Sequence, residues 1–311
     1  MTTLLRAACF SVSAVAGLGA HAQDTVGAIE FVEAQTGTPL STIEITTETV
    51  APGLHVLFGA GGNIAVSIGA QGVFIVDDQF PAIVPKIRDA IHALGGSDVD
   101  FVINTHWHFD HTNGNPLLAA TGSLIVSQAN SRQMMLDDRI VNLVNVRVEQ
   151  PASPPTALPV ITYDDRLVFH FNDQQIELLH FGPAHTTGDT AVIFRGSNAV
   201  HMGDIFSNWG YPFIDADNGG GLDGVVAFGE AILNEINEST IVIPGHGAVA
   251  TYTDLEEYVS MLKAIRDRLA VLIADGATLD EVIAAKPTAE WDAVEGDPTR
   301  LLDRAYRSMT R

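Results

Sequence analysis

Cysteine is almost absent from this chain. Its 311 residues include one cysteine, Cys9, near the amino terminus. A single cysteine cannot close a disulfide within the chain, so the sequence excludes a disulfide framework. Hydrophobic residues make up 46% of the sequence, and a chain of this length and composition can bury a large core. Stability is therefore expected to come from packing.

Basic residues are also scarce. The chain has 16 lysines and arginines against 38 aspartates and glutamates, a formal net charge of −22. Nucleic-acid binding depends on neutralising phosphates with basic side chains, so this balance excludes nucleic acid as the expected substrate. The acidic residues are distributed without a block that would form a tail. We expect a small-molecule substrate, and the sequence leaves the oligomeric state open.

Long apolar runs are missing except at the amino terminus. Residues 1–22 resemble a secretory signal: Arg6 supplies the early charge, residues 7–19 are apolar and small, and Ala20-His21-Ala22 forms an A-x-A cleavage site. We therefore predict a mature chain of residues 23–311, without Cys9, in the periplasm or secreted. No other apolar run reaches the length needed to span a membrane.

The remaining pattern alternates strands and helices, which predicts an α/β fold. We expect a single domain over residues 23–311, with a helical extension from about residue 254. Residues 23–40 are expected to form a short helix or an arm. The strands expected in the first half span residues 42–49, 53–58, 63–69 and 73–77, and helices are expected at 81–94, from Asn115 as an N-cap, at 254–274 and after a capping box at Thr278.

The densest chemical signal is the segment 104–111, which reads N-T-H-W-H-F-D-H. It places His106, His108, Asp110 and His111 directly after an apolar run at residues 99–103 that predicts a buried strand. Imidazole and carboxylate are ligands that divalent zinc prefers. Loops at the carboxyl ends of strands commonly carry the chemistry of α/β proteins. A metal site is therefore expected here.

Three further donors repeat this arrangement. His185, Asp204 and His246 each follow an apolar strand and lie beside Gly or Pro, where the backbone can turn sharply. Strand ends that deliver histidine and aspartate are expected to converge on one site. Because six or seven donors exceed the four ligands of one tetrahedral zinc, the sequence predicts two metal ions.

The order H-x-H-x-D-H, then His, Asp and His, resembles the metallo-β-lactamase fold superfamily, and so do Gly61-Gly62-Asn63 and the strand at residues 73–78. The resemblance covers roughly residues 40 to 253. It implies a four-layer αβ/βα sandwich. It also implies a ligand set for each of two zinc ions: His106, His108 and His185 for the first, and Asp110, His111 and His246 for the second. Asp204 matches a position where hydrolases such as glyoxalase II have a bridging aspartate.

The resemblance also implies a function: a periplasmic dinuclear zinc hydrolase whose metal-bound hydroxide cleaves an amide- or ester-type bond, with Asp110 orienting that hydroxide. β-Lactam hydrolysis is one candidate, supported by export and by the Asp110-His111 pair. A thioesterase or lactonase is the alternative, because β-lactamases with a comparable ligand set typically have Ser at the position of Asp204. A periplasmic metal-binding protein without turnover is a third hypothesis, which the complete ligand set disfavours.

Substrate contacts are expected on two loops. Residues 58–62, rich in glycine, are expected to form a mobile flap, with Phe58 as an apolar wall. Ser207, Trp209 and Tyr211 follow Asp204 and are expected to line the pocket, and Asn218 is expected to donate to an oxyanion. The alternative is that Trp209 and Tyr211 pack the core. Asp189 is a candidate partner that would support the ligands from within the His185 loop. His55, His92 and His170 are expected to be structural or exposed. His180 and His201 lie near ligands and are candidate partners of them, but alternation along their strands is expected to point them elsewhere.

Overall fold

The computed structural model describes residues 25–311. The predicted signal at residues 1–22, with Cys9, lies outside the described residues, so export stays a prediction. Among the described residues, no helix is both long and apolar enough to cross a membrane.

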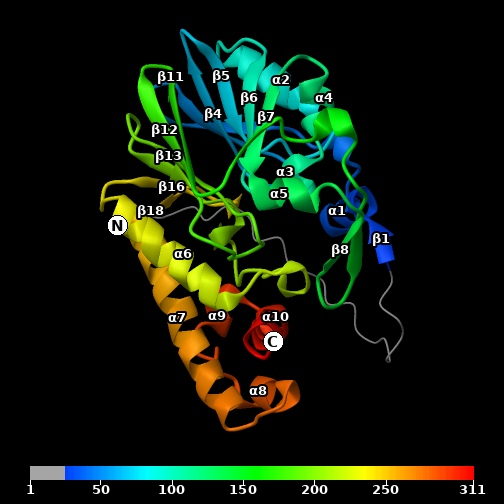
Figure 1. Ribbon diagram of the computed structural model, residues 1–311, viewed down its shortest axis with the longest axis vertical. Coiled ribbons are helices and arrows are strands. Elements are labelled where there is room, and N and C mark those ends of the chain that lie inside the picture. Colours follow the sequence, from blue (N-terminus) through cyan, green and yellow to red (C-terminus); the bar gives the residue numbers. More distant parts are fainter. Residues whose placement is uncertain (1–24) are drawn as a thin grey trace, which may run out of the picture.

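Two large sheets face each other at the centre of the molecule (Figure 1). The seven-stranded first sheet has the order β10-β7-β6-β5-β4-β3-β2. Its strands are β2 (Thr46–Ala51), β3 (Leu54–Phe58), β4 (Ile64–Gly69), β5 (Gly72–Val76), β6 (Val99–Asn104), β7 (Leu124–Gln128) and β10 (Ile161–Tyr163). The six-stranded second sheet has the order β11-β12-β13-β14-β16-β18. Its strands are β11 (Arg166–Phe171), β12 (Gln174–Leu179), β13 (Ala191–Phe194), β14 (Ala199–His201), β16 (Ile241–Ile243) and β18 (Ala250–Thr251).

An apolar layer joins the inner faces of the two sheets. Phe74 on β5 makes edge contacts with Phe194 on β13 and Phe169 on β11, with ring centroids 6.2 and 5.3 Å apart. Phe74 and Phe194 are fully buried. Rings packed in this way bind the two sheets through their large apolar area and their edge-to-face geometry.

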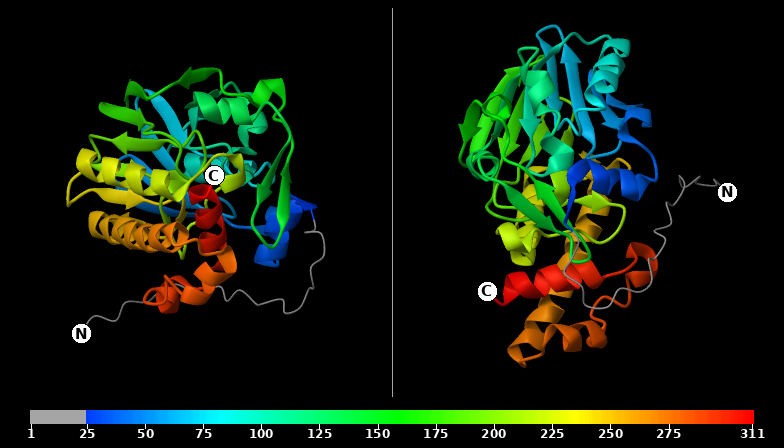
Figure 2. Two further views of the ribbon diagram at one scale, coloured as in Figure 1. Left: turned by 60° about the horizontal axis from the view of Figure 1, so that its bottom comes forward. Right: turned by 90° about the vertical axis from the view of Figure 1, so that its right-hand side faces the viewer.

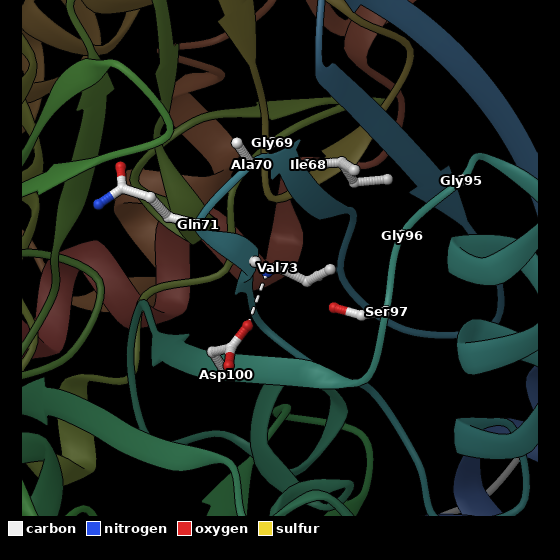
Figure 3. Close-up of a pocket in the computed structure, with 10 residues that line it drawn as sticks. Ile68, Gly69, Ala70, Gln71, Val73, Gly95, Gly96, Ser97 and Asp100 are labelled. Carbon is white, nitrogen blue, oxygen red and sulfur yellow. Dashed lines mark hydrogen bonds between the residues drawn. The ribbon is translucent and has the colours of Figure 1, made fainter.

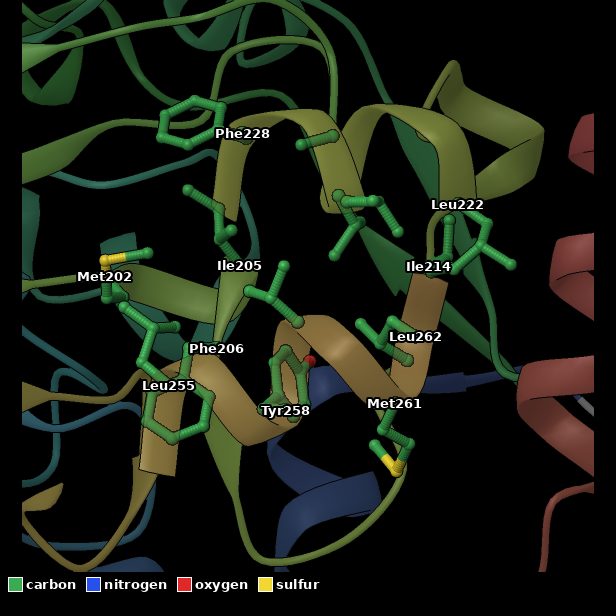
Figure 4. Packing of buried hydrophobic residues seen from close by; sticks show 14 of the residues in the cluster. Met202, Ile205, Phe206, Ile214, Leu222, Phe228, Leu255, Tyr258, Met261 and Leu262 are labelled. Carbon is green, nitrogen blue, oxygen red and sulfur yellow. The ribbon is translucent and has the colours of Figure 1, made fainter. Parts of the chain in front are cut away.

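Helices cover the outer faces. The first sheet is covered by α2 (Val84–Ala93), α4 (Asn115–Ala119) and α5 (Ala129–Met134), and the second by α6 (Leu222–Glu235) and α7 (Tyr252–Ala274). Strand β5 is therefore buried on both faces, as its continuous apolar sequence requires, and the second half of β6 is buried as well. In the second outer layer, Phe206, Leu255 and Leu262 pack around Tyr258 (Figure 4). The expected four-layer αβ/βα sandwich is confirmed.

The carboxyl-terminal helices belong to the same core. After α7 come α8 (Leu279–Ala285), α9 (Asp292–Glu295) and α10 (Thr299–Met309). Leu301, Leu302 and Ala305 of α10 are buried in one cluster with α6 and α7. Helix α7 begins two residues earlier than expected because Thr251 and Asp254 form a capping box, and the capping box expected at Thr278 does begin α8.

The amino-terminal region departs from expectation in detail. Residues 23–40 were expected as a helix or an arm, and they contain β1 (Thr25–Gly27) and α1 (Ala28–Thr36). Strand β1 pairs with a hairpin, β8 (Arg139–Asn142) and β9 (Arg147–Gln150), in a separate three-stranded sheet. The strand expected to begin at residue 42 begins at Thr46, because a 3₁₀ turn, η1 (Leu40–Thr42), follows Pro39.

Parallel pairing fixes where the functional loops meet. Strands β5, β6 and β7 run parallel, and so do β14 and β16. Parallel neighbours end at the same edge of a sheet, so the loops that follow them are brought together. The short helix α3 (Phe109–Thr112) lies at this edge, after β6. Asn115 is not the N-cap of α4, because Gly114 occupies that position and the Asn115 side chain pairs with Asn104 instead.

Candidate metal centre

All seven donors predicted from the sequence meet at this edge. They form three overlapping groups, and within each group the ligand atoms lie within 4.8 Å of one another. The groups are His106 with His108 and His185, His106 with His111 and Asp204, and Asp110 with His111 and His246. We call the first the first metal group and the third the second metal group. The first metal group is buried, so its donors are poorly solvated, whereas in the second only His111 is buried and Asp110 and His246 are partly exposed.

Asp77, at the end of β5, organises the histidine loop. Its carboxylate accepts from the Thr105 backbone N–H and hydroxyl, both at 2.8 Å, and pairs with His111 Nδ1 at 2.7 Å. Asp77 has a φ of 66°, which is uncommon for a residue with a side chain and is found where the surrounding structure imposes it. Asp77 therefore fixes both the loop after β6 and the orientation of a donor ring.

Each of three donor histidines has a second, outer partner on its other nitrogen. His111 Nδ1 pairs with Asp77, His108 Nε2 lies 2.9 Å from Asp215 Oδ2, and His185 Nδ1 lies 2.8 Å from the Phe213 carbonyl oxygen. Such partners fix the tautomer and the ring plane of a metal ligand. They leave Nε2 of His111, Nδ1 of His108 and Nε2 of His185 facing the site.

The roles of Asp77 and Asp215 as partners of the ligands were not predicted from the sequence. Asp77 offered a signal, because it ends a buried strand just as the ligands do. Asp215 offered none, since it lies in a stretch without a metal motif. Asp189, which was expected to support the His185 loop, accepts from the Thr186 backbone N–H at 2.8 Å and hydroxyl at 2.7 Å. It holds the loop backbone rather than the ring of His185.

The inward nitrogens fit metal ions. His185 Nε2 lies 2.9 Å from His108 Nδ1, and His111 Nε2 lies 3.3 Å from His246 Nε2. His106 Nε2 is buried and has no hydrogen-bond partner. Lone pairs aimed at a shared point repel one another unless a cation lies between them. Ligands at 2.0–2.1 Å from a tetrahedral zinc are roughly 3.3 Å apart, so these groups suit divalent metal ions.

Asp204 lies between the two metal groups. Its Oδ1 is 3.2 Å from His111 Nε2 and 3.4 Å from His246 Nε2, and its Oδ2 is 3.7 Å from His185 Nε2. One oxygen therefore faces the second metal group and the other faces the first. This is the placement required of a carboxylate that contacts two metals.

The two metal groups differ in charge when no metal is bound. Burial, followed by the charge of His111, holds the pKa of His106 well below its usual value, and burial with the charge of His108 lowers the pKa of His185. Burial also opposes protonation of His246, but Asp204 and Asp110 outweigh it and raise its pKa to about 9. The same carboxylates hold the pKa of His111 well above its usual value despite burial. The second metal group is therefore the more protonated one near neutral pH.

The glycine-rich loop at residues 58–62 packs closely against two of the metal ligands. A Cβ on Gly62 would lie 2.2 Å from the His111 ring, and one on Gly61 would lie 2.4 Å from the Asp110 carbonyl oxygen. The Gly62 N–H donates to Asp110 O at 3.0 Å. The loop expected to be a mobile flap thus packs directly against the ligands, and glycine allows this close approach. Phe58 is partly buried against the apolar layer between the sheets rather than forming a wall of the site.

Of the predicted substrate contacts, Trp209 is the one that lies on the exposed side of the metal centre, beside His246. It is 71% exposed, and its ring stacks on His246 with centroids 4.9 Å apart and planes within 7°. Ser207 is buried, and its hydroxyl has no partner. The Tyr211 hydroxyl turns away and donates to Asp292 at 2.9 Å. The Asn218 amide donates to Ile140 O and to Asp215, so it has no donor left for an oxyanion.

A hollow lies at the opposite edge of the first sheet, where the β4–β5 turn meets the start of β6 (Figure 3). It has a volume of about 380 Å³ and is lined largely by glycine and small residues. Its carboxylate, Asp100, already accepts from the Val73 N–H at 2.8 Å. The hollow contains none of the metal groups, so the chemistry lies at the other edge.

Several known proteins are similar to this chain in sequence. A "probable metallo-hydrolase" of Methanocaldococcus jannaschii is 23% identical over 62% of this chain and 90% of its own length. The lactamase-like protein aptB of Emericella nidulans is 24% identical over 68% of this chain, which covers 61% of that protein.

Solved structures share the fold. A metallo-β-lactamase from Cronobacter sakazakii with a HARLDQ motif matches 80% of this chain and all of its own, with a TM-score of 0.60 and 18% identity. A metallo-β-lactamase from Pontibacter korlensis matches 71% of this chain and 99% of its own, with a TM-score of 0.57 and 15% identity. The profile of the Metallo-beta-lactamase superfamily matches residues 58–276, which contain all seven donors. By its sequence, its sheets and its clustered donors, the chain belongs to the metallo-beta-lactamase superfamily.

Proposed function

We propose that this protein is a dinuclear zinc hydrolase of small molecules, exported to the periplasm, and that its substrates are thioesters or lactones. The observation that carries the proposal is the position of Asp204, whose two carboxylate oxygens face different metal groups. A serine at this position could not span both groups with two oxygens. The predicted signal at residues 1–22 and the net charge of −22 support export and solubility.

The most exposed donors indicate from which side a substrate reaches the metal centre. The Asp110, Asp204 and His246 side chains keep 18%, 16% and 13% of their surface, whereas His106 and His111 are fully enclosed. A substrate carbonyl therefore approaches beside Asp110 and Asp204. A pair of zinc ions would supply an activated water and an electrophile for the carbonyl oxygen. Asp110, 3.2 Å from His246 Nε2, would orient that water.

The leaving group favours a thioester over an amide, whereas the alkoxide of a lactone would depend on a bound metal ion for stabilisation. An amide nitrogen must take up a proton before it departs, whereas a thiolate, whose thiol has a pKa of about 8.5, departs as an anion. Despite burial, histidine neighbours lower the pKa of both Asp110 and Asp204, which makes these carboxylates weak proton donors. The exposed side of the metal centre, with these two carboxylates, therefore suits a leaving group that needs no proton.

β-Lactam hydrolysis is the second candidate. The observation that favours it is the Asp110-His111 pair with His246, an oxygen and nitrogen ligand set without cysteine. In that case the second metal would stabilise the amide nitrogen as it leaves. A strained β-lactam ring would also lower the barrier relative to an ordinary amide.

Turnover by the mature chain, residues 23–311 loaded with zinc, tests both candidates. We expect kcat/KM of about 10⁴ M⁻¹s⁻¹ or more for a chromogenic thioester or an aliphatic lactone, and at least about tenfold less for a chromogenic cephalosporin. The metal-stripped protein and a folded His108→Ala variant serve as inactive controls. The reverse ranking would favour β-lactams. No turnover of any of the three substrates with two zinc ions bound would contradict both candidates and favour a metal-binding protein.

A further inference from the structure

The last helix of the chain lies against the segment that supports the first metal group. Helix α10 lies next to η4 (Ala216–Asn218), and the right-hand view of Figure 2 shows it, in red, below the β8–β9 hairpin. Arg304 of α10 is only 2% exposed, and its Nη1 donates to Asp217 Oδ2 at 3.0 Å. Its Nε donates to Asp303 Oδ1 at 2.8 Å. A buried guanidinium held by two carboxylates is rigidly placed.

One carboxylate oxygen of Asp217 links η4 to both β8 and α10. The oxygen that receives Arg304 also accepts from Asn142 Nδ2 of β8 at 2.7 Å. Its neighbour Asn218 donates from Nδ2 to the Ile140 carbonyl oxygen at 2.9 Å, so a second bond ties η4 to β8. The 3₁₀ turn is thus held between the hairpin and α10. A turn of three residues has little stability of its own, so these outside contacts fix its position.

The same turn holds the partner of a metal ligand. Asp215 accepts from Asn218 Nδ2 at 2.9 Å through Oδ2, the oxygen that also pairs with His108 Nε2. Asp215 and His108 are 1% and 3% exposed. This contact turns His108 Nδ1 toward His185 Nε2, 2.9 Å away. The contacts therefore run without a gap from α10 to the first metal group.

We propose that Arg304 is a positioning residue of the metal centre: through Asp217 and η4 it sets the orientation of Asp215 and thereby of His108. Residue 304 lies beyond residues 58–276, which the superfamily profile matches, so the profile does not include this contact. Loss of Arg304 would release η4 from α10 and allow Asp215 to shift. Loss of an outer partner of a metal-bound histidine typically weakens metal binding by about 10- to 100-fold.

Zinc affinity, measured by competition with a fluorescent chelator, tests the proposal without any substrate. The measured zinc affinity depends on metal binding by the proposed centre but not on which reaction the protein catalyses. A His246→Ala background isolates the first metal group. In that background we expect Arg304→Gln to weaken zinc binding by about tenfold or more, with partial recovery in Arg304→Lys. Asp217→Asn, a milder change of the same contact, should weaken it in the same direction.

Arg307→Gln is the matched control, because Arg307 lies on the same helix and contacts Asp303 but donates to neither η4 nor Asp217. It should leave zinc affinity unchanged. Adding Arg304→Gln to Asp215→Asn should cause little further loss, because both act through His108. The proposal is overturned if Arg304→Gln and Asp217→Asn leave the first metal group at wild-type affinity. It is also overturned if Arg307→Gln weakens zinc binding as much as they do.

Discussion

At the residue scale, the ligands of the two metal groups respond differently to protons. Zinc binds neutral imidazole, so a proton on a ligand competes with the metal. The pKa values of His106 and His185 lie below the usual value, while that of His246 lies at about 9. Near pH 7 the proton must therefore leave His246 before the second metal binds. The order of metal loading follows from this difference.

We expect zinc to bind the second metal group more weakly as pH falls. His246 is half protonated at its pKa of about 9 and almost fully protonated at pH 7, so its protonation alone should lower the apparent affinity there by about 50-fold between pH 9 and pH 7. His111, whose pKa is also raised, should add to this loss. The affinity of the first metal group should change much less. Calorimetric zinc titrations at several pH values measure both. Equal pH dependence at the two groups would contradict this account.

Trp209 offers a second prediction at the scale of single residues. Stacking on an aromatic ring is worth roughly 0.5–1.5 kcal/mol, and the exposed ring over His246 offers such a surface to a substrate. Trp209→Ala should raise KM about three- to tenfold with kcat nearly unchanged, and Trp209→Phe should restore most of the loss. Because the side chain is 71% exposed and loses only its stack on His246, the melting temperature should fall by no more than about 5 °C. A fall in kcat at constant KM would argue against a binding role.

At the scale of elements, local sequence determined most of what could be predicted. Helix α7 followed from its apolar spacing and α8 from its capping box, because these signals lie within a few residues. The ligand positions followed from strand ends. The sheet of β1 with β8 and β9 was not predicted, because parallel pairing between β1 and β9 joins residues that are far apart in sequence. The roles of Asp215 and Arg304 were missed for the same reason.

The cap of α7 offers a test at this scale. The Thr251 hydroxyl pairs with the Asp254 carboxylate at 2.7 Å and accepts from the Asp254 N–H. Thr251→Ala should lower the free energy of unfolding by about 1 kcal/mol. The neighbouring Thr253→Ala, within the helix and without a cap role, should change it little. Urea unfolding of the two variants measures the difference, and equal losses would rule out the cap as the cause.

At the scale of the whole molecule, the metal centre joins the two halves of the sandwich. His106, His108, Asp110 and His111 follow a strand of the first sheet, whereas His185, Asp204 and His246 follow strands of the second. Metal binding therefore stabilises the contact between the sheets as well as the site. The fold was predictable because the donor motifs resemble a known superfamily, while the support from α10 lies outside that pattern.

Removing the metals should destabilise the entire protein. A ligand at 1,000 times its dissociation constant adds about 4 kcal/mol of stability, and each kcal/mol corresponds to about 2–4 °C in a chain of 150–250 residues. We expect a chelator to lower the melting temperature by roughly 10 °C, and zinc to restore it. Calorimetry with and without chelator measures this. An unchanged melting temperature would mean that the metals do not stabilise the contact between the sheets.

The distribution of donors over both sheets also has a consequence for the time course of folding. Each metal group takes donors from both sheets, so neither site is complete until the two sheets have come together. Contacts between residues far apart in sequence form slowly, because the chain entropy is lost before they are gained. Zinc should therefore leave the refolding rate nearly unchanged and slow unfolding instead. Metal supply would then set how long the folded protein lasts rather than how quickly it forms.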